Sequence, residues 1–139
     1  RHIQQLWKKL VYLYQVLNIY VEFDLDDIHI SLDQASAFGL IINEIFSNIL
    51  KHAFSSHEEG KVRVSLKRGT LGQIQVHILD SGKGISRDID MHSKNNLGLW
   101  LIENLVHNQL KGKLLIYSAK GTNIKFSFLP ENQVNIHLF

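Results

Sequence analysis

Two alternating segments joined by a glycine-containing turn constrain the fold of this chain more than any other feature. Apolar and polar residues alternate through residues 61–68 and again through residues 73–79, across a turn at Gly69–Gly72. Because successive side chains of a strand point to opposite faces, this pattern predicts a β-hairpin with one buried face and one wet face. The apolar positions are Val62, Val64, Leu66, Ile74, Val76 and Ile78.

Three other segments have the apolar spacing of helices. Apolar residues recur every three or four positions in residues 3–17, 34–54 and 97–110, which predicts three helices with one apolar stripe each. In the last of these helices, the stripe is expected to comprise Leu97, Leu101 and Leu105.

Short signals mark the ends of two of these helices. Ser31 and Gln34 have the spacing of a capping box, with Asp33 as a rival cap, so the second helix is expected to begin near residue 34. The third helix is expected to stop at Lys111–Gly112, where the glycine supplies the helix-ending conformation.

Alternation also predicts four shorter strands. Two short strands are expected at residues 19–25 and 28–32, and a final hairpin is expected at residues 113–118 and 122–128. The turns fall at Asp26–Asp27 and at Lys120–Gly121. Strands with one polar face and helices with one apolar stripe fit an α+β, two-layer sandwich. We expect a mixed, mostly antiparallel sheet covered on one face by three helices.

Composition limits the function classes. The chain has 139 residues, 45% hydrophobic and 20% charged, which suits one domain over residues 1–139. A net charge of +2 argues against nucleic acid, and the lack of cysteine suits a reducing cytoplasm. No apolar run approaches the roughly 20 residues of a membrane helix. Because the first residue is Arg1 rather than methionine, the chain is expected to be a piece of a longer protein.

A polar stripe runs along the edge of the apolar face of the second helix. Glu44, Asn48, Lys51 and Ser55 fall within about 60 degrees of one another on a helical projection. An amide can ligate Mg²⁺, a lysine can meet phosphate oxygens, and a carboxylate can act as a base. These side chains therefore suit a metal-bound phosphate, although a plain solvated face explains them equally well.

An acidic residue followed by glycines ends the second strand of the hairpin. Asp80 precedes Gly82 and Gly84, in the segment LDSGKGI, and the polar residues 81–96 that contain it predict a long loop. Glycines let a ligand approach the backbone, and a carboxylate can accept a hydrogen bond from an amino group such as that of adenine. The spacing is not that of a Rossmann or P-loop motif, and a simple turn also accounts for it.

Two further glycines stand where ligands commonly bind. Gly98 opens the third helix, where free backbone N–H groups favour an anion, and Gly121 precedes Thr122 at the start of the last strand. A helix entry and a hairpin turn are the alternatives. The two histidines His52 and His57 do not make a zinc site without a third ligand.

In this order, the four segments resemble the ATP-binding catalytic domain of sensor histidine kinases, within the GHKL or Bergerat-fold superfamily of ATPases. NEIFSNILKHA is similar to the asparagine box, DSGKGI to the first glycine box, NLGLWLI to the second and GTNIKFSF to the last. The resemblance covers residues 3–128. It is greatest to the kinases whose acceptor segment reads like HHRVKNN.

The resemblance implies a site for ATP and Mg²⁺. Asn48 would ligate Mg²⁺, Lys51 and His52 would contact phosphate, and Glu44 would be the catalytic or positioning base. Asp80 would read the adenine amino group, and residues 83–96 would form a lid over the nucleotide. The other residues implied to contact the nucleotide are Gly82, Gly84, Ile85, Asn96, Leu97, Gly98, Leu99 and Thr122.

The resemblance also implies a reaction and its partners. The domain would transfer the γ-phosphoryl group of ATP to a histidine on a partner dimerisation and phosphoacceptor domain, from which a response regulator receiver domain would take it. This two-component signalling would be cytoplasmic, in a membrane-attached or free sensor kinase, without contact of this domain with nucleic acid or membrane. The alternatives are a non-catalytic nucleotide-binding or docking module and a GHKL ATPase or anti-sigma serine kinase.

Two departures from the family pattern qualify these expectations. Asn95 and Asn96 stand where the second glycine box usually begins with a glycine. The sequence also contains no acceptor segment, so phosphoacceptor and sensor domains are expected to lie outside it. We therefore expect this chain on its own to bind ATP and to phosphorylate itself weakly or not at all.

Overall fold

The computed structural model describes residues 2–14, 18–53, 59–82, 97–131 and 135–137. Two helices are extended by a wider, π-helical turn, labelled η. The elements are α1 (His2–Tyr14), β1 (Ile19–Leu25), β2 (His29–Ser31), α2 (Leu32–Asn48), η1 (Ile49–Ala53), β3 (Gly60–Arg68), β4 (Ile74–Asp80), α3 (Leu97–Asn104), η3 (Leu105–Gln109), β5 (Lys113–Ser118), β6 (Thr122–Phe128) and β7 (Asn135–His137).

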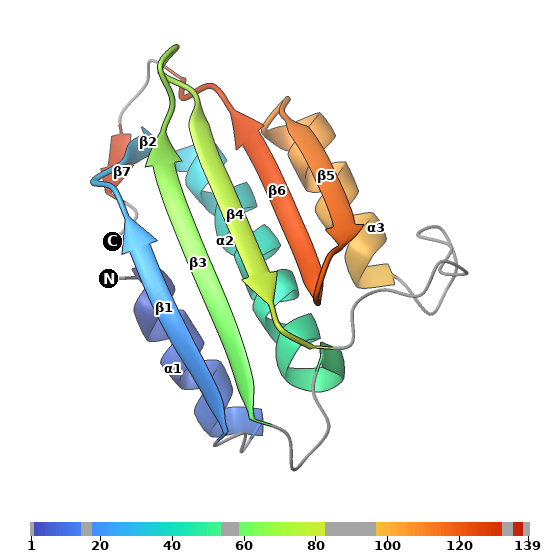
Figure 1. The fold of residues 1–139 in the computed structure, drawn as a ribbon. Helices are drawn as coiled ribbons and strands as arrows, with labels where there is room; N and C mark the ends of the chain where they lie inside the picture. Colours follow the sequence, from blue (N-terminus) through green and yellow to red (C-terminus); the bar gives the residue numbers. More distant parts are fainter. Residues whose placement is uncertain (1, 15–17, 54–58, 83–96, 132–134, 138–139) are drawn as a thin grey trace.

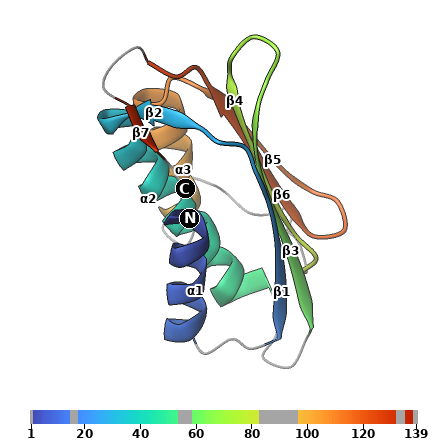
Figure 2. The same cartoon turned by 90° about the vertical axis from the view of Figure 1, so that its left-hand side faces the viewer.

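Five of the strands form one mixed sheet, and the helices cover one of its faces (Figures 1 and 2). The strand order is β1-β3-β4-β6-β5, with β1 parallel to β3 and all other neighbours antiparallel. This is the α+β, two-layer sandwich expected from the sequence. The predicted hairpin is confirmed as β3 and β4, with a turn in which Gly72 has a φ of 82°.

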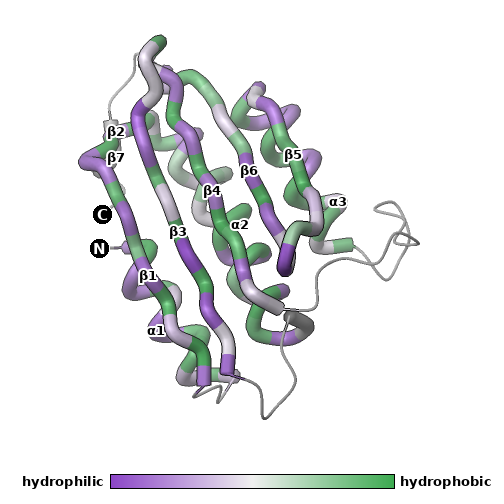
Figure 3. The backbone as a smooth tube through the Cα atoms, in the orientation of Figure 1, coloured by the Kyte–Doolittle hydropathy of each residue, from purple (hydrophilic) through white to green (hydrophobic). Residues whose placement is uncertain are grey.

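The core lies between the sheet and the helices. The alternation of hydropathy along the strands is visible in Figure 3, and the six apolar positions of the β3–β4 hairpin are all at most 2% exposed. Their counterparts on α2 are Ile41, Ile42, Ile45 and Phe46. Trp7 of α1 packs edge-on against Phe46 with 5.0 Å between ring centroids, so α1 and α2 share this core.

The start of α2 is fixed by the predicted cap, with one difference. Ser31 accepts a hydrogen bond from the backbone N–H of Gln34 at 3.2 Å, and the helix begins at Leu32. The Gln34 side chain does not complete the capping box. Instead it donates to the carbonyl of Leu129 at 2.8 Å and accepts from the N–H of Glu131 at 3.0 Å. This buried amide therefore ties the segment after β6 to the beginning of α2.

The predicted apolar stripe of the third helix is only partly correct. Leu97 is 64% exposed, whereas Leu105 packs against the core. The buried positions are Ile102 and Val106 on the helix and Leu110 directly after it. The predicted stripe and the buried stripe are offset by one residue, which is about 100 degrees around a helix. In both, apolar residues recur at helical spacing. Periodicity alone could not choose between them.

The predicted reason for the end of this helix is wrong. The left-handed residue is Lys111, with a φ of 53°, rather than Gly112. Gly112 is required for a different reason, because a Cβ there would lie 2.1 Å from the backbone oxygen of Ser127. The glycine therefore allows the chain to pass closely over β6 on its way into β5.

One strand of a small pair was not predicted. β7 pairs antiparallel with β2, as in His29 opposite His137, whereas only β2 was expected, within residues 28–32. The pairing joins segments that are distant in the sequence. Among the described residues, no helix combines the length and apolar character needed to cross a membrane.

Candidate functional site

The side chains of Glu44 and Asn48 lie directly beneath the first turn of α3. A Cβ placed on Gly98 would lie 2.8 Å from Glu44 Oε2 and 3.3 Å from Asn48 Nδ2. A side chain at this position would displace the ends of both polar side chains, so the glycine lets them lie directly against the backbone. Three residues from two distant segments therefore meet here, and the free N–H groups of a helix N-terminus are near a carboxylate and an amide.

Asn48 also marks a change in the helix itself. It is the last residue of α2, and the chain continues into the π-helical turn η1, Ile49–Ala53. Such widened turns inside helices occur frequently at functional sites. The continuous helix expected over residues 34–54 is therefore two segments, and the change falls at the residue predicted to bind metal.

Lys51 lies apart from this pair. Its side chain is exposed, and its ammonium nitrogen is 5.6 Å from the centre of the Tyr14 ring, at the end of α1. The attraction between a cation and an aromatic face holds it there. The side chain of His52 and all of Gly84, Ile85 and Asn96 lie outside the described residues, as do residues 83–96 of the predicted lid.

A second group of polar contacts surrounds the end of β4. The carboxylate of Asp80, which is only 3% exposed, accepts hydrogen bonds at Oδ1 from the N–H of Gly82 at 2.9 Å and of Thr122 at 3.4 Å. Among the described residues, no donor contacts Oδ2. The structure thus brings together Asp80, Gly82 and Thr122, which were predicted separately.

Gly121 is essential to this arrangement. The sequence placed it in a hairpin turn and in the segment that resembles the last box of the family, but did not indicate the contact that requires it. Its φ is +122°, and a Cβ there would lie 1.8 Å from the carbonyl oxygen of Asp80. The β5–β6 turn can therefore lie against the backbone of Asp80 only because residue 121 has no side chain. No local signal in the sequence reveals a contact between residues 41 positions apart.

Burial raises the pKa of the Asp80 carboxyl above its ordinary value, while the N–H groups of Gly82 and Thr122 oppose part of the rise. The opposite holds for Asp26, whose pKa is lowered, mainly by a hydrogen bond from the backbone N–H of Arg68 at 3.0 Å. Because burial disfavours the ionised carboxylate, Asp80 does not stabilise the fold in that form and is a candidate for a functional position.

These opposite shifts predict opposite effects of pH on stability. Because folded Asp80 binds its proton more tightly than the unfolded chain does, its contribution to the free energy of unfolding falls as pH rises from about 4. We expect Asp80→Asn to be as stable as or more stable than the wild type at neutral pH, with the difference disappearing in acid. Asp26→Asn, the control, should be the less stable variant at neutral pH. Thermal denaturation at several pH values measures both; a neutral-pH loss of stability in Asp80→Asn would contradict the assignment.

The two groups of contacts lie at one end of the molecule. Figure 1 shows the end of β4, the end of α2 and the start of α3 at the same end of the sheet, with the β5–β6 turn beside them. Leu97 and Leu99 are on the first turn of α3, and Leu99 packs against the core. One group offers a buried acceptor and the other offers oxygen ligands beside a helix N-terminus. Together they suit a ligand with a hydrogen-bond donor at one end and phosphates at the other.

A divalent metal fits only one of these groups. No cluster of three His, Cys, Asp or Glu residues exists among the described residues. The Asn48 amide and the Glu44 carboxylate are nevertheless the oxygen ligands that Mg²⁺ accepts, and Mg²⁺ is commonly held by one or two protein ligands together with phosphates of a substrate. The residues present therefore fit a metal that is bound jointly with a nucleotide.

Comparison with known proteins agrees with this geometry. A family described as histidine kinase-like ATPase domain matches residues 6–128. The blue-light-activated histidine kinase 2 of Erythrobacter litoralis is 32% identical over 88 residues, 63% of this chain and 25% of that protein. The sensor histidine kinase PdtaS of Mycobacterium tuberculosis is 30% identical over 95 residues, 66% of this chain and 19% of that protein.

A solved structure shows the same fold. The histidine kinase domain of a blue-light-activated histidine kinase from Erythrobacter litoralis superposes with a TM-score of 0.80 at 25% sequence identity, covering 91% of this chain and 58% of that one. The chain spans a quarter or less of the length of the two curated relatives. It is therefore similar to one portion of proteins that contain more.

Proposed function

The chain belongs to the family of histidine kinase-like ATPase domains, and we propose that it binds ATP with Mg²⁺ and supplies the γ-phosphoryl group to a histidine of a partner domain. Family membership supports a nucleotide-binding, kinase-type role. The observation that carries the finer proposal is the buried Asp80 carboxylate, which accepts from Gly82 and Thr122 at one oxygen and from no described residue at the other.

Asp80 is proposed to select adenine. The 6-amino group of adenine donates a hydrogen bond that Oδ2 is free to accept among the described residues, whereas guanine has a carbonyl oxygen at that position. Gly82 is proposed to let the purine lie close to the backbone, and Thr122 supports the carboxylate through its N–H. Gly84 and Ile85 remain proposed contacts of the nucleotide.

Asn48 and its neighbours are proposed to bind the phosphates. Asn48 would ligate Mg²⁺ together with phosphate oxygens, while Gly98 and the start of α3 would face the phosphates. Lys51 and His52 are proposed to neutralise their charge, which for Lys51 requires the ammonium to leave the face of the Tyr14 ring. Mg²⁺, when bound, supplies positive charge to the phosphates, and the chain's own groups position them for in-line transfer.

Glu44 is proposed to act on the group that receives the phosphoryl. Its carboxylate lies beside Asn48 under the backbone of Gly98, which is where a partner histidine would approach the phosphates. A carboxylate at that position can orient the imidazole and accept its proton as the new N–P bond forms and the bond to the β-phosphate oxygen breaks. Leu97 and Leu99 are proposed to contact the nucleotide from the start of α3, and Asn96 remains a proposed contact as well.

Asp80→Asn tests the adenine assignment. A hydrogen bond to a charged group is worth about 1.5–3 kcal/mol, so ATP affinity should fall about tenfold or more. GTP affinity should stay constant or rise, because an asparagine amide can donate to the guanine carbonyl. Fluorescence titration with both nucleotides measures the ratio, and equal losses for ATP and GTP would contradict the assignment. Thermal denaturation shows in parallel that the variant is folded.

Phosphotransfer tests the proposed reaction. The chain is mixed with labelled ATP, Mg²⁺ and a separate dimerisation and phosphoacceptor domain from a sensor histidine kinase of this family, and acid-labile phosphohistidine is measured. The proposal predicts label on the acceptor, and none when its histidine is replaced by glutamine. ATP binding without any transfer would favour a non-catalytic module, and acid-stable phosphoserine would favour a serine kinase.

A further inference from the structure

The sheet has a second face that no described element covers. Figure 2 shows the helices on one side of the sheet only, so the outward side chains of the strands meet solvent there. This face is separate from the candidate nucleotide site, because Asp80 and the inward residues of β4 point toward the helices while His77 and Gln75 point outward. A ligand of the open face would therefore not compete with nucleotide.

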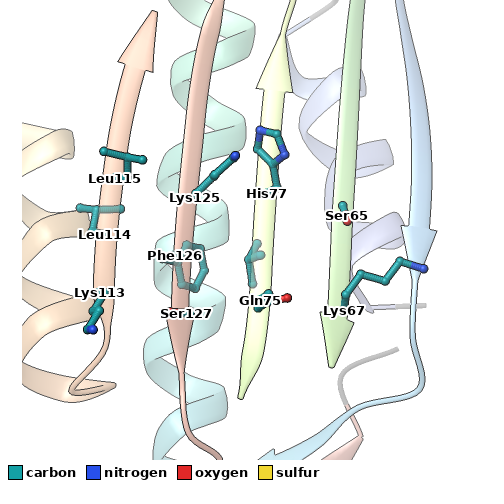
Figure 4. A pocket seen from close by; sticks show the side chains of 11 residues that line it. Ser65, Lys67, Gln75, His77, Lys113, Leu114, Leu115, Lys125, Phe126 and Ser127 are labelled. Atoms are coloured by element: carbon teal, nitrogen blue, oxygen red, sulfur yellow. The ribbon is translucent and has the colours of Figure 1, made fainter. Parts of the chain in front are cut away.

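The outward side chains line a hollow of about 410 Å³ over β3, β4, β6 and β5 (Figure 4). The strand register places them in two rows across the sheet. One row is Ser65, His77, Lys125 and Leu115, and the other is Lys67, Gln75, Ser127 and Lys113. The hollow thus mixes hydrogen-bonding groups with cations: Lys125 lies within the first row, and Lys67 and Lys113 stand at the two ends of the second.

Charge divides this face into two unlike halves. On the half formed by β1 and β3, the acids and bases neutralise one another. Arg63 lies 3.6 Å from both Glu22 and Asp24, and Lys67 pairs with Asp24 and with Asp26. In Figure 4, the Lys67 side chain extends from the edge of the hollow toward β1. This half offers a partner little net charge.

The half formed by β4, β6 and β5 is basic. Lys113 and Lys125 pair with no carboxylate among the described residues; Lys125 lies instead over the Tyr117 ring, 5.5 Å from its centre. Beside them, His77 is hydrogen-bonded to Asn123 at 3.0 Å. The outward positions of these three strands contain no acidic residue. Their two ammonium groups therefore favour a negatively charged occupant.

An apolar side chain stands among these cations. Leu115 faces outward from the edge strand β5 and is 56% exposed, directly opposite Lys125 in the register. Exposed leucines in isolation are ordinary, but this one lines the hollow together with the basic groups. A partner that matches the surface needs carboxylates for Lys113 and Lys125 and an apolar side chain for Leu115.

We propose that the open face over β4, β6 and β5 docks an acidic protein segment that carries an apolar side chain between its carboxylates. Nucleic acid fits less well, because two uncompensated lysines are few for phosphate-backbone binding and an exposed leucine contributes nothing to it. Docking here leaves the nucleotide site open, so the inference stands independently of the proposed reaction.

The test uses the whole 139-residue chain. A peptide with the sequence Ac-Glu-Asp-Leu-Glu-Asp-amide is titrated into isotope-labelled chain, and backbone amide shifts are followed by NMR. The proposal predicts saturable, salt-sensitive shifts at His77, Leu115 and Lys125. It also predicts that Lys113→Glu/Lys125→Glu lowers affinity about tenfold or more and leaves ATP binding unchanged. Leu115→Ser should weaken binding of the peptide, but the salt dependence of binding should stay the same because no charge is removed.

A matched variant controls for net charge. Lys8→Glu/Lys9→Glu makes the same change in charge at exposed positions of α1, in the other layer, and should bind the peptide as the wild type does. Equal weakening by both double variants would overturn the proposal, as would equal binding of a peptide with lysines in place of the acids. Tighter binding of a single-stranded oligonucleotide would assign the face to nucleic acid instead. Concentration-dependent shifts at this face without peptide would assign it to a second copy of the chain.

Discussion

Replacing Asn48 with alanine is expected to abolish the contribution of Mg²⁺ to ATP binding. The amide is the only side chain proposed to ligate the metal, and it lies beneath the backbone of Gly98. We expect ATP affinity in the presence of Mg²⁺ to fall about a hundredfold. Calorimetric titration with and without Mg²⁺ measures this loss.

Asn43→Ala is the matched control for this variant. Asn43 lies on the same helix, is half-buried, and is assigned no role in the site. The control should bind Mg-ATP as the wild type does, and both variants should unfold at similar temperatures. Unchanged ATP affinity in Asn48→Ala, with the fold intact, would mean that the phosphates bind elsewhere.

Gly121→Ala is expected to destabilise the fold more than any other single glycine substitution in the described residues. The new Cβ would lie 1.8 Å from the carbonyl oxygen of Asp80, at a φ of +122° that side chains rarely adopt. Neither atom can move without shifting backbone, because both belong to paired strands or their turn. We expect a loss of about 3 kcal/mol or more in the free energy of unfolding. Urea denaturation measures it.

Gly72→Ala measures the cost of the left-handed backbone conformation without the cost of a clash. Gly72 also has a positive φ, of 82°, but nothing lies within 4 Å of a Cβ placed there. Its substitution should therefore cost only the conformational term, about 1–2 kcal/mol. Equal losses in the two variants would show that the contact between the β5–β6 turn and Asp80 is unimportant for stability.

The elements with strong periodicity were predictable from the sequence. The β3–β4 hairpin follows directly from the alternation of residues 61–79, since a strand with one buried face can bury only alternate side chains. Ser31 was correctly identified as a cap of α2 because its side chain satisfies a backbone N–H that the helix leaves free. These features depend on residues near one another in the chain.

Features that depend on distant contacts were not predictable. The short β7 owes its existence to pairing with β2, and Gln34 uses its amide for Leu129 and Glu131 rather than for the capping box. Gly112 and Gly121 are glycines because of backbone atoms brought close by the fold, at Ser127 and Asp80. A sequence indicates that a glycine is present but not which atom excludes its side chain.

In the candidate site too, the residues could be chosen from the sequence, but the contacts between distant residues could not. Asp80, Asn48 and Gly98 could be chosen from residue type, position at the end of a strand or helix, and family resemblance. The direct approach of Gly98 to Glu44 and Asn48, and the sharing of Asp80 between Gly82 and Thr122, required the structure. The position of Lys51 over Tyr14 was also unexpected, because Tyr14 belongs to a helix that the motifs do not include.

The most direct test of the proposed nucleotide site is an NMR titration of the isotope-labelled chain with a non-hydrolysable ATP analogue and Mg²⁺. The proposal predicts saturable binding with the largest amide shifts at Gly82 and Thr122, around Asp80, and at Gly98 and Asn48. Shifts confined to the open face of the sheet, around His77 and Lys125, or no saturable binding at about 1 mM nucleotide, would contradict it.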